Sequence, residues 1–174
     1  KNNQNFKQNK IQIKNKIKIA YFSARFYNCA TLHNMLDVFK NHNKNDFEIY
    51  AFNYGKIDSW TKKINKYFNK FFEVANLSLE EILKLGKQND IHVAVDLTGY
   101  TKNARNEIFL NQIAPIQINF LGYPGTLGSK MYDYILADKI VIPKEFEKYY
   151  SEKVLRLPNC YLPTQANQKI SSKN

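Results

Sequence analysis

The sequence predicts an α/β protein with a Rossmann-like, mainly parallel β-sheet and helices on both faces of that sheet. Short apolar runs alternate with stretches whose apolar residues recur at helical spacing. One run, Ile91–Leu97 (IHVAVDL), is nearly continuous in apolar residues, which is typical of a parallel strand buried on both faces. This alternation favours parallel strands that are joined by crossover helices.

In the first half of the chain, the pattern predicts three strands and two helices. The first strand is Ile17–Ser23, and a helix with one apolar face follows at Thr31–Lys40. Phe47–Asn53 is the second strand and Phe71–Val74 a brief third one. A Lys-rich helix is expected between them at Ser59–Lys70.

In the second half, one helix precedes a run of strands. Ser78, with Glu81 three residues further on, forms a capping box that begins a helix, and this helix is expected to stop at Gly86. The strands expected after it are Ile91–Leu97, Ile116–Leu121, Tyr134–Ala137 and Val154–Leu157.

The composition indicates a globular protein and excludes several other classes. Of 174 residues, 44% are hydrophobic and 14% aromatic, which excludes general disorder. Two cysteines, Cys29 and Cys160, are too few for a disulfide scaffold. No apolar run approaches the length of a membrane span, and the N-terminus lacks a signal-peptide core. We therefore expect a cytoplasmic protein.

The net charge of +11 raises the possibility of a nucleic-acid partner, but the type of basic residue disfavours it. Only three of the 26 basic residues are arginines, whereas nucleic-acid readers favour the bidentate guanidinium. The abundance of Lys together with Asn, Ile, Tyr and Phe is typical of AT-rich coding sequence.

Both ends of the chain are expected to lie outside the folded unit. Residues 1–16 are polar and rich in Lys and Asn, and residues 164–174 are similar, so both are expected to be linker or disordered segments. The folded unit is therefore predicted to span residues 17–163. The absence of Met at position 1 indicates a piece of a longer protein.

Three loops follow predicted strands at the position where open α/β sheets bind ligands. They are Ser23–Thr31, Thr98–Arg105 and Gly122–Gly128. Because parallel strands share one carboxyl edge, we expect these loops to converge there.

The loop Leu121–Gly128 (LGYPGTLG) has two interpretations. Its glycines and proline fix a rigid path and bare the backbone N–H groups, which would let a sugar or phosphate approach the main chain. The same residues also fit a plain turn after a strand. The loop matches neither a P-loop nor GxGxxG.

Two charged residues near the second loop also have two interpretations each. Asp96 ends a buried strand, where a carboxylate either caps the following turn or serves a function. Arg105 could pair with a phosphate or with an internal carboxylate.

The other reactive side chains form no catalytic or metal-binding pattern. Cys29 lies near a helix start with no adjacent histidine, which favours a packing role over a nucleophile. Asn28 and Thr31 are candidates to cap that helix. The histidines, which show no metal-ligand spacing, are His33, His42 and His92.

Four stretches of the chain carry a family resemblance: DLTGYTKNARNEIF, APIQINFLGYPGTLG, YDYILADKIVIP and YSEKVLRLP. In this order they resemble the catalytic region of the O-GlcNAc transferase family, glycosyltransferase family 41, which includes SPINDLY-like proteins. The resemblance extends from Ile17 to Pro163.

The resemblance implies one Rossmann-like lobe of a GT-B-type enzyme. The family transfers GlcNAc from UDP-GlcNAc to Ser or Thr of acceptor proteins without a metal ion or other cofactor, while SPINDLY-type relatives use GDP-fucose. The chain is expected to cover the N-terminal lobe of the catalytic region, without the C-terminal lobe or the tetratricopeptide repeats. The positions that match the family motifs and are expected to bind substrate are Asn28, Thr31, Leu121, Gly122, Tyr123 and Pro124.

The first loop departs from the family pattern, which reads Ser-x-Asp-Phe-x-x-His. Arg25 stands where the Asp is expected and Cys29 where the His is expected. The charge is reversed and an imidazole suited to proton transfer is lost, so no catalytic residue is assigned to this chain. His33 matches a second family histidine but is not assigned as a base. The chain by itself is expected to be inactive, and the alternative is an inert Rossmann-like fragment that binds protein or sugar.

Overall fold

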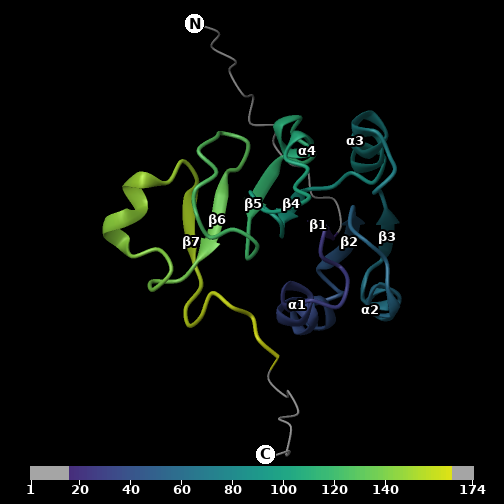
Figure 1. The fold of residues 1–174 in the computed structure, drawn as a ribbon, viewed down its shortest axis with the longest axis horizontal. Coiled ribbons are helices and arrows are strands. Elements are labelled where there is room, and N and C mark those ends of the chain that lie inside the picture. The colour runs from purple at the N-terminus through teal and green to yellow at the C-terminus, as the bar shows by residue number, and fades with distance from the viewer. Residues whose placement is uncertain (1–15, 166–174) are drawn as a thin grey trace, which may run out of the picture.

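A computed structural model describes residues 16–165 of the chain. Its sheet has seven strands, all parallel, in the order β3-β2-β1-β4-β5-β6-β7 (Figure 1). The predicted α/β fold with a parallel sheet is confirmed. The predicted lead-in and tail, residues 1–16 and 164–174, lie almost wholly outside the described residues.

Each predicted strand is present, although several are shifted or shorter. β1 (Ile17–Ser23), β2 (Phe47–Asn53) and β6 (Tyr134–Ala137) have the predicted bounds. The other strands are β3 (Lys70–Glu73), β4 (Val93–Asp96), β5 (Ile116–Asn119) and β7 (Lys153–Arg156).

Helices cover both faces of the sheet, as predicted. α1 (Ala30–Asn41) and α2 (Ser59–Ile64) lie on one face, and α3 (Leu79–Gln88) and α4 (Glu107–Leu110) on the other (Figure 1). The two faces of the sheet form two hydrophobic cores, and successive residues of β1 pack into one core or the other. Tyr21 belongs to the cluster that holds the buried residues of α1 and α2, and Phe22 to the cluster that holds those of α3 and α4.

The helix predicted over Ser59–Lys70 is wrong in its second half. α2 ends at Ile64, a 3₁₀ turn, η1 (Asn65–Tyr67), follows, and β3 already begins at Lys70. The side chain of Asn69 accepts a hydrogen bond from Ile49 N (2.8 Å), and Asn69 N donates to Ile49 O (2.7 Å). These contacts to β2 draw the chain into the sheet and override the local helical pattern.

The predicted stop of α3 at Gly86 is also wrong, because the helix continues to Gln88. Gly86 serves packing instead, since a Cβ there would lie 2.4 Å from Cδ1 of Ile113. The capping box is confirmed: Ser78 Oγ accepts from Glu81 N, and Ser78 N donates to the Glu81 carboxylate.

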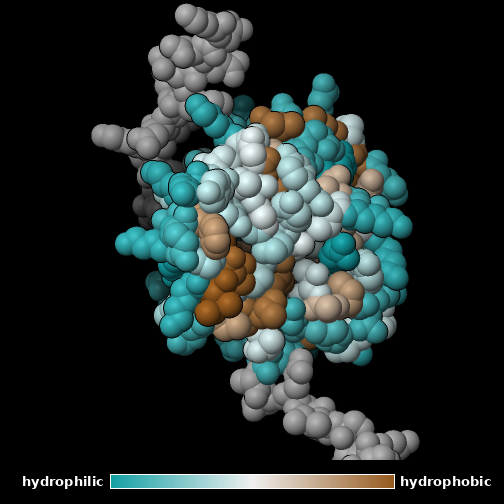
Figure 2. Space-filling model, turned by 60° about the vertical axis from the view of Figure 1, so that its left-hand side comes forward, coloured by the Kyte–Doolittle hydropathy of each residue, from teal (hydrophilic) through white to brown (hydrophobic). Residues whose placement is uncertain are grey.

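Hydrophobic side chains remain exposed at the β7 end of the sheet. Ile140, Phe146 and Leu155 come from the turn after β6, from η2 (Lys144–Tyr149) and from β7. Figure 2, which brings this end of the molecule forward, shows hydrophobic surface bordered by hydrophilic side chains. Within residues 16–165, no helix is both long and apolar enough to cross a membrane.

The strand order places a topological switch point between β1 and β4. From β1 the chain builds outward to β2 and β3, and then returns to the other side of β1 to form β4 and β5. The loops after β1 and β4 therefore leave the sheet in opposite directions. Open α/β sheets bind ligands in the crevice that such a divergence creates.

Candidate functional site

The loops after β1, β4 and β5 meet at the carboxyl edge of the sheet, as the sequence predicted. Ala24 N, just after β1, donates to Thr98 Oγ1, just after β4 (3.2 Å). Gly122, after β5, packs against the carbonyls of Leu97 and Thr98 so closely that a Cβ would lie 2.2 Å from Leu97 O. These contacts define the site edge, by which we mean the three loops Ser23–Thr31, Thr98–Arg105 and Gly122–Gly128.

Asp96 anchors the middle of the site edge. Its carboxylate is 1% exposed and accepts hydrogen bonds from Thr98 N (2.8 Å), Gly99 N (3.1 Å) and the Tyr132 hydroxyl (2.6 Å). Burial raises the pKa of Asp96 above its ordinary value and also raises the pKa of Tyr132. The turn-capping interpretation of Asp96 is therefore confirmed.

Arg25 lies at the switch point, at the start of the first loop. Its Nη2 donates to Thr101 Oγ1 at 3.4 Å, and its backbone N–H donates to Ser23 Oγ at 2.9 Å. Among residues 16–165, no carboxylate forms an ion pair with this guanidinium. A half-buried and unpaired positive charge thus occupies the position where the resemblance expects an acid.

α1 begins without the predicted side-chain cap. Its N-cap residue is Cys29, which makes no capping hydrogen bond, so the predicted caps Asn28 and Thr31 are wrong. The cause is Asp58 from the loop after β2, whose carboxylate accepts from Asn28 N (2.9 Å) and fixes the loop from outside. The Asn28 side chain turns instead toward His33, with Oδ1 lying 2.7 Å from Nε2.

Gly122 and Gly125 are explained by packing within the protein. A Cβ at Gly122 would collide with the backbone of Leu97 and Thr98, just after β4, and one at Gly125 would lie 2.9 Å from the ring of Tyr123. The plain-turn interpretation therefore accounts for both glycines. Neither presents open backbone that requires a ligand to explain it.

The remaining predicted substrate-binding residues of this loop lie at the same edge. Leu121 adopts a left-handed conformation (φ 70°), and its carbonyl accepts from the Tyr161 hydroxyl (2.6 Å). The half-buried Tyr123 packs near the Tyr100 ring, with centroids 6.0 Å apart, and Pro124 is exposed. Their role toward substrate stays a prediction, as does that of Asn28 and Thr31.

Glu152 supports the glycine-rich loop, a role that sequence reasoning missed. This carboxylate is 4% exposed and accepts from Thr126 Oγ1 (2.7 Å), Leu127 N (2.8 Å) and Ser151 Oγ (3.1 Å). It precedes β7 directly and so ties the loop to the far part of the sheet. Its position in the motif YSEKVLRLP is the one signal that could have singled it out.

Arg105 pairs within the protein. Its Nε lies 2.8 Å from Glu107 Oε1, and its Nη1 donates to Leu77 O at 3.1 Å. Of the two predicted interpretations, the internal carboxylate is the one that the structure supports.

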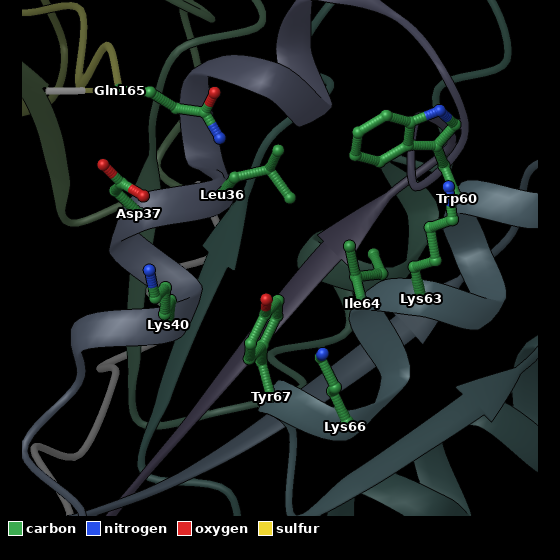
Figure 3. Close-up of a pocket in the computed structure, with 9 residues that line it drawn as sticks. All are labelled: Leu36, Asp37, Lys40, Trp60, Lys63, Ile64, Lys66, Tyr67 and Gln165. Atoms are coloured by element: carbon green, nitrogen blue, oxygen red, sulfur yellow. The ribbon is translucent and has the colours of Figure 1, made fainter. Parts of the chain in front are cut away.

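The rest of the described structure offers no metal-binding cluster, and its one described hollow lies away from the predicted site residues. The part of the chain that the structure describes contains no cluster of three or more His, Cys, Asp or Glu side chains arranged to hold a metal ion. A hollow of about 260 Å³ lies between α1, α2 and η1, with Asp37, Lys40, Trp60 and Tyr67 on its walls (Figure 3). None of the predicted site residues lines it, so it is separate from the site edge.

The chain belongs to glycosyl transferase family 41, whose family model matches residues 1–171. It is 37% identical over 156 residues to the probable UDP-N-acetylglucosamine--peptide N-acetylglucosaminyltransferase SEC of Arabidopsis thaliana, covering 88% of this chain and 16% of that protein. It is 32% identical to the UDP-N-acetylglucosamine--peptide N-acetylglucosaminyltransferase of Caenorhabditis elegans, covering 87% of this chain and 13% of that one.

The fold matches that of a solved family structure. The Thermobaculum terrenum O-GlcNAc transferase mutant K341M superposes with a TM-score of 0.82 at 24% identity, over 86% of this chain and 29% of that chain. The Rossmann-like sheet is therefore one lobe of a GT-B architecture. The chain spans less than a fifth of the length of the two curated relatives that it matches.

Proposed function

We propose that this chain is the N-terminal catalytic lobe of a protein O-glycosyltransferase that transfers GlcNAc from UDP-GlcNAc to Ser or Thr of acceptor proteins. The observation that carries the proposal is the convergence of two family motifs, DLTGYTKNARNEIF and APIQINFLGYPGTLG, on one edge of the sheet, beside the loop after β1 at the switch point. The two relatives named above carry UDP-N-acetylglucosamine in their names and match most of this chain, which supports UDP-GlcNAc as the donor.

In this proposal the lobe supplies a rigid wall of the cleft. The Asp96 hydrogen bonds fix the loop Thr98–Arg105, and the Glu152 carboxylate fixes the loop Gly122–Gly128. The Tyr100 hydroxyl joins the two loops by donating to Leu127 O at 2.8 Å. Holding groups in a fixed orientation toward a substrate lowers the entropic part of a reaction barrier. A second lobe is needed to close the cleft around the donor.

A second candidate function is favoured by the first loop. Arg25 and Cys29 replace the carboxylate and the imidazole that the resemblance leads one to expect, and neither is an ordinary proton acceptor at neutral pH. This departure favours an inert Rossmann-like module that binds a protein or a sugar without turnover.

The isolated chain is expected to transfer no sugar, because one lobe leaves the donor without half of its cleft. The measurement is incorporation of label from UDP-GlcNAc into an acceptor protein by the purified chain, beside a reaction without the chain. Incorporation well above that background would contradict the expectation. Circular dichroism on the same sample ensures that an inactive chain is a folded one.

A further inference from the structure

We propose that Arg25 gives this lobe a preference for acidic acceptor segments, because its guanidinium binds a carboxylate of a chain lying across the loops after β1 and β4. This inference rests on the proposed function, since it names the class of acceptor. It treats Arg25 as a specificity-determining residue, with no part in proton transfer.

The first observation is the unused binding capacity of Arg25. A guanidinium has five N–H donors, and here the one hydrogen bond that it donates within residues 16–165 is the 3.4 Å contact to Thr101 Oγ1. The side chain is half-buried, so its charge is only partly screened by water. A carboxylate from a partner fits the remaining donors in a bidentate arrangement.

The second observation is the balance of charge around Arg25. Lys56, after β2, and Lys102, after β4, are exposed at the same edge, and Lys56 Nζ lies over the Tyr27 ring at 4.3 Å. The acidic groups nearby are already engaged. Asp58 accepts backbone N–H groups, and Glu107 pairs with Arg105. Hydrogen bonds to neutral N–H groups leave the Asp58 charge in place, so Arg25, Lys56 and Lys102 outnumber one unpaired carboxylate, and the edge carries a net positive charge.

The third observation disfavours a nucleotide phosphate as the anion. Dinucleotide sites on such sheets use a glycine-rich turn after the first strand and a free helix N-terminus. Here residues 23–29 contain no glycine, and the Asp58 carboxylate already binds Asn28 N beside the start of α1. Tyr100, which is 49% exposed, instead offers contact surface for a polypeptide.

The test is a fluorescence-anisotropy titration of the full 174-residue chain with two labelled serine peptides at low ionic strength. One peptide carries Asp and Glu around the serine, and the other carries Asn and Gln at the same positions. We expect the acidic peptide to bind about two- to fivefold more tightly, as a partly exposed charge pair allows.

Two sets of variants distinguish the effect of Arg25 on the peptide preference from the effect of the protein's overall positive charge. Arg25→Gln is expected to remove most of the preference and Arg25→Lys to retain part of it. Lys84→Gln, on the exposed side of α3, makes the same change in net charge and is expected to leave the preference intact. Equal losses in Arg25→Gln and Lys84→Gln would overturn the proposal, because the binding would then be non-specific.

A competition experiment with UDP shows whether Arg25 binds a peptide carboxylate or a nucleotide phosphate. Displacement of the acidic peptide by UDP in the wild type, together with loss of UDP binding in Arg25→Gln, would assign Arg25 to phosphate and overturn the proposal. Because peptide binding is measured without transfer, a chain that prefers the acidic peptide through Arg25 but transfers nothing even when joined to the remainder of a catalytic region would contradict the proposed function and leave the acidic preference standing.

Discussion

Asp96→Ala is expected to lower the free energy of unfolding by about 3 kcal/mol, because it leaves three buried donors without their acceptor. These donors are Thr98 N, Gly99 N and the Tyr132 hydroxyl. No cation pairs with this carboxylate among the residues that the structure describes, so its hydrogen bonds alone hold it. Urea denaturation followed by circular dichroism gives the value.

Two milder variants provide reference values for the loss in free energy of unfolding expected from Asp96→Ala. Tyr132→Phe removes one of the three donors and is expected to lower the free energy of unfolding by about 1 kcal/mol. Asp96→Asn keeps one acceptor oxygen and, because burial already disfavours the charged carboxylate, is expected to fall between the two. A loss in Asp96→Ala no larger than that in Tyr132→Phe would mean that Asp96 does not anchor the turn.

Gly122→Val is expected to destabilise the protein by about 2–4 kcal/mol, because its Cβ has no space. The atoms that it would meet are backbone atoms at the end of β4, at 2.2 Å for Leu97 O and 2.8 Å for Thr98 O, so no side chain can move aside. The loop Gly122–Gly128 must shift as a whole and lose its contact with Thr98. Thermal unfolding of the variant beside the wild type measures this loss.

Gly128→Ala is the matched control for that variant. A Cβ at Gly128 would have no atom within 4 Å, but the residue adopts a φ of +62°. Alanine there is therefore expected to lower the free energy of unfolding by only about 1 kcal/mol, through backbone strain. Similar melting temperatures for Gly122→Val and Gly128→Ala would contradict the steric explanation of Gly122.

The strands of the sheet could be predicted because each is indicated by the apolar residues within its own short segment. β1 and β2 have the predicted bounds since every residue in them either packs into a core or pairs in the ladder. The helix end at Ile64 could not be predicted, because Asn69 bonds to Ile49 on the neighbouring strand. Leu97 is buried like a strand residue although β4 ends at Asp96, so apolar character alone extended the prediction too far.

The site edge could be predicted only in part. Parallel strands bring their following loops to one edge, and this rule sufficed to bring Thr98 and Gly122 together. The cap of α1 could not be predicted, because Asp58 reaches Asn28 from a loop that lies 30 residues further along. The support by Glu152 depends on contacts to Thr126 across 26 residues, for which no local pattern exists.

The measurement that tests the central claim most directly compares sugar transfer by two proteins. One is this chain alone, and the other is the chain joined to the remainder of the catalytic region of the Caenorhabditis elegans relative. With labelled UDP-GlcNAc and an acidic acceptor protein, we expect label in the acceptor from the joined protein only. Its rate is expected to be below that of the relative, because Cys29 stands where the family resemblance predicts an imidazole. A joined protein that is folded and binds UDP but transfers nothing would contradict the claim that this chain is a catalytic lobe.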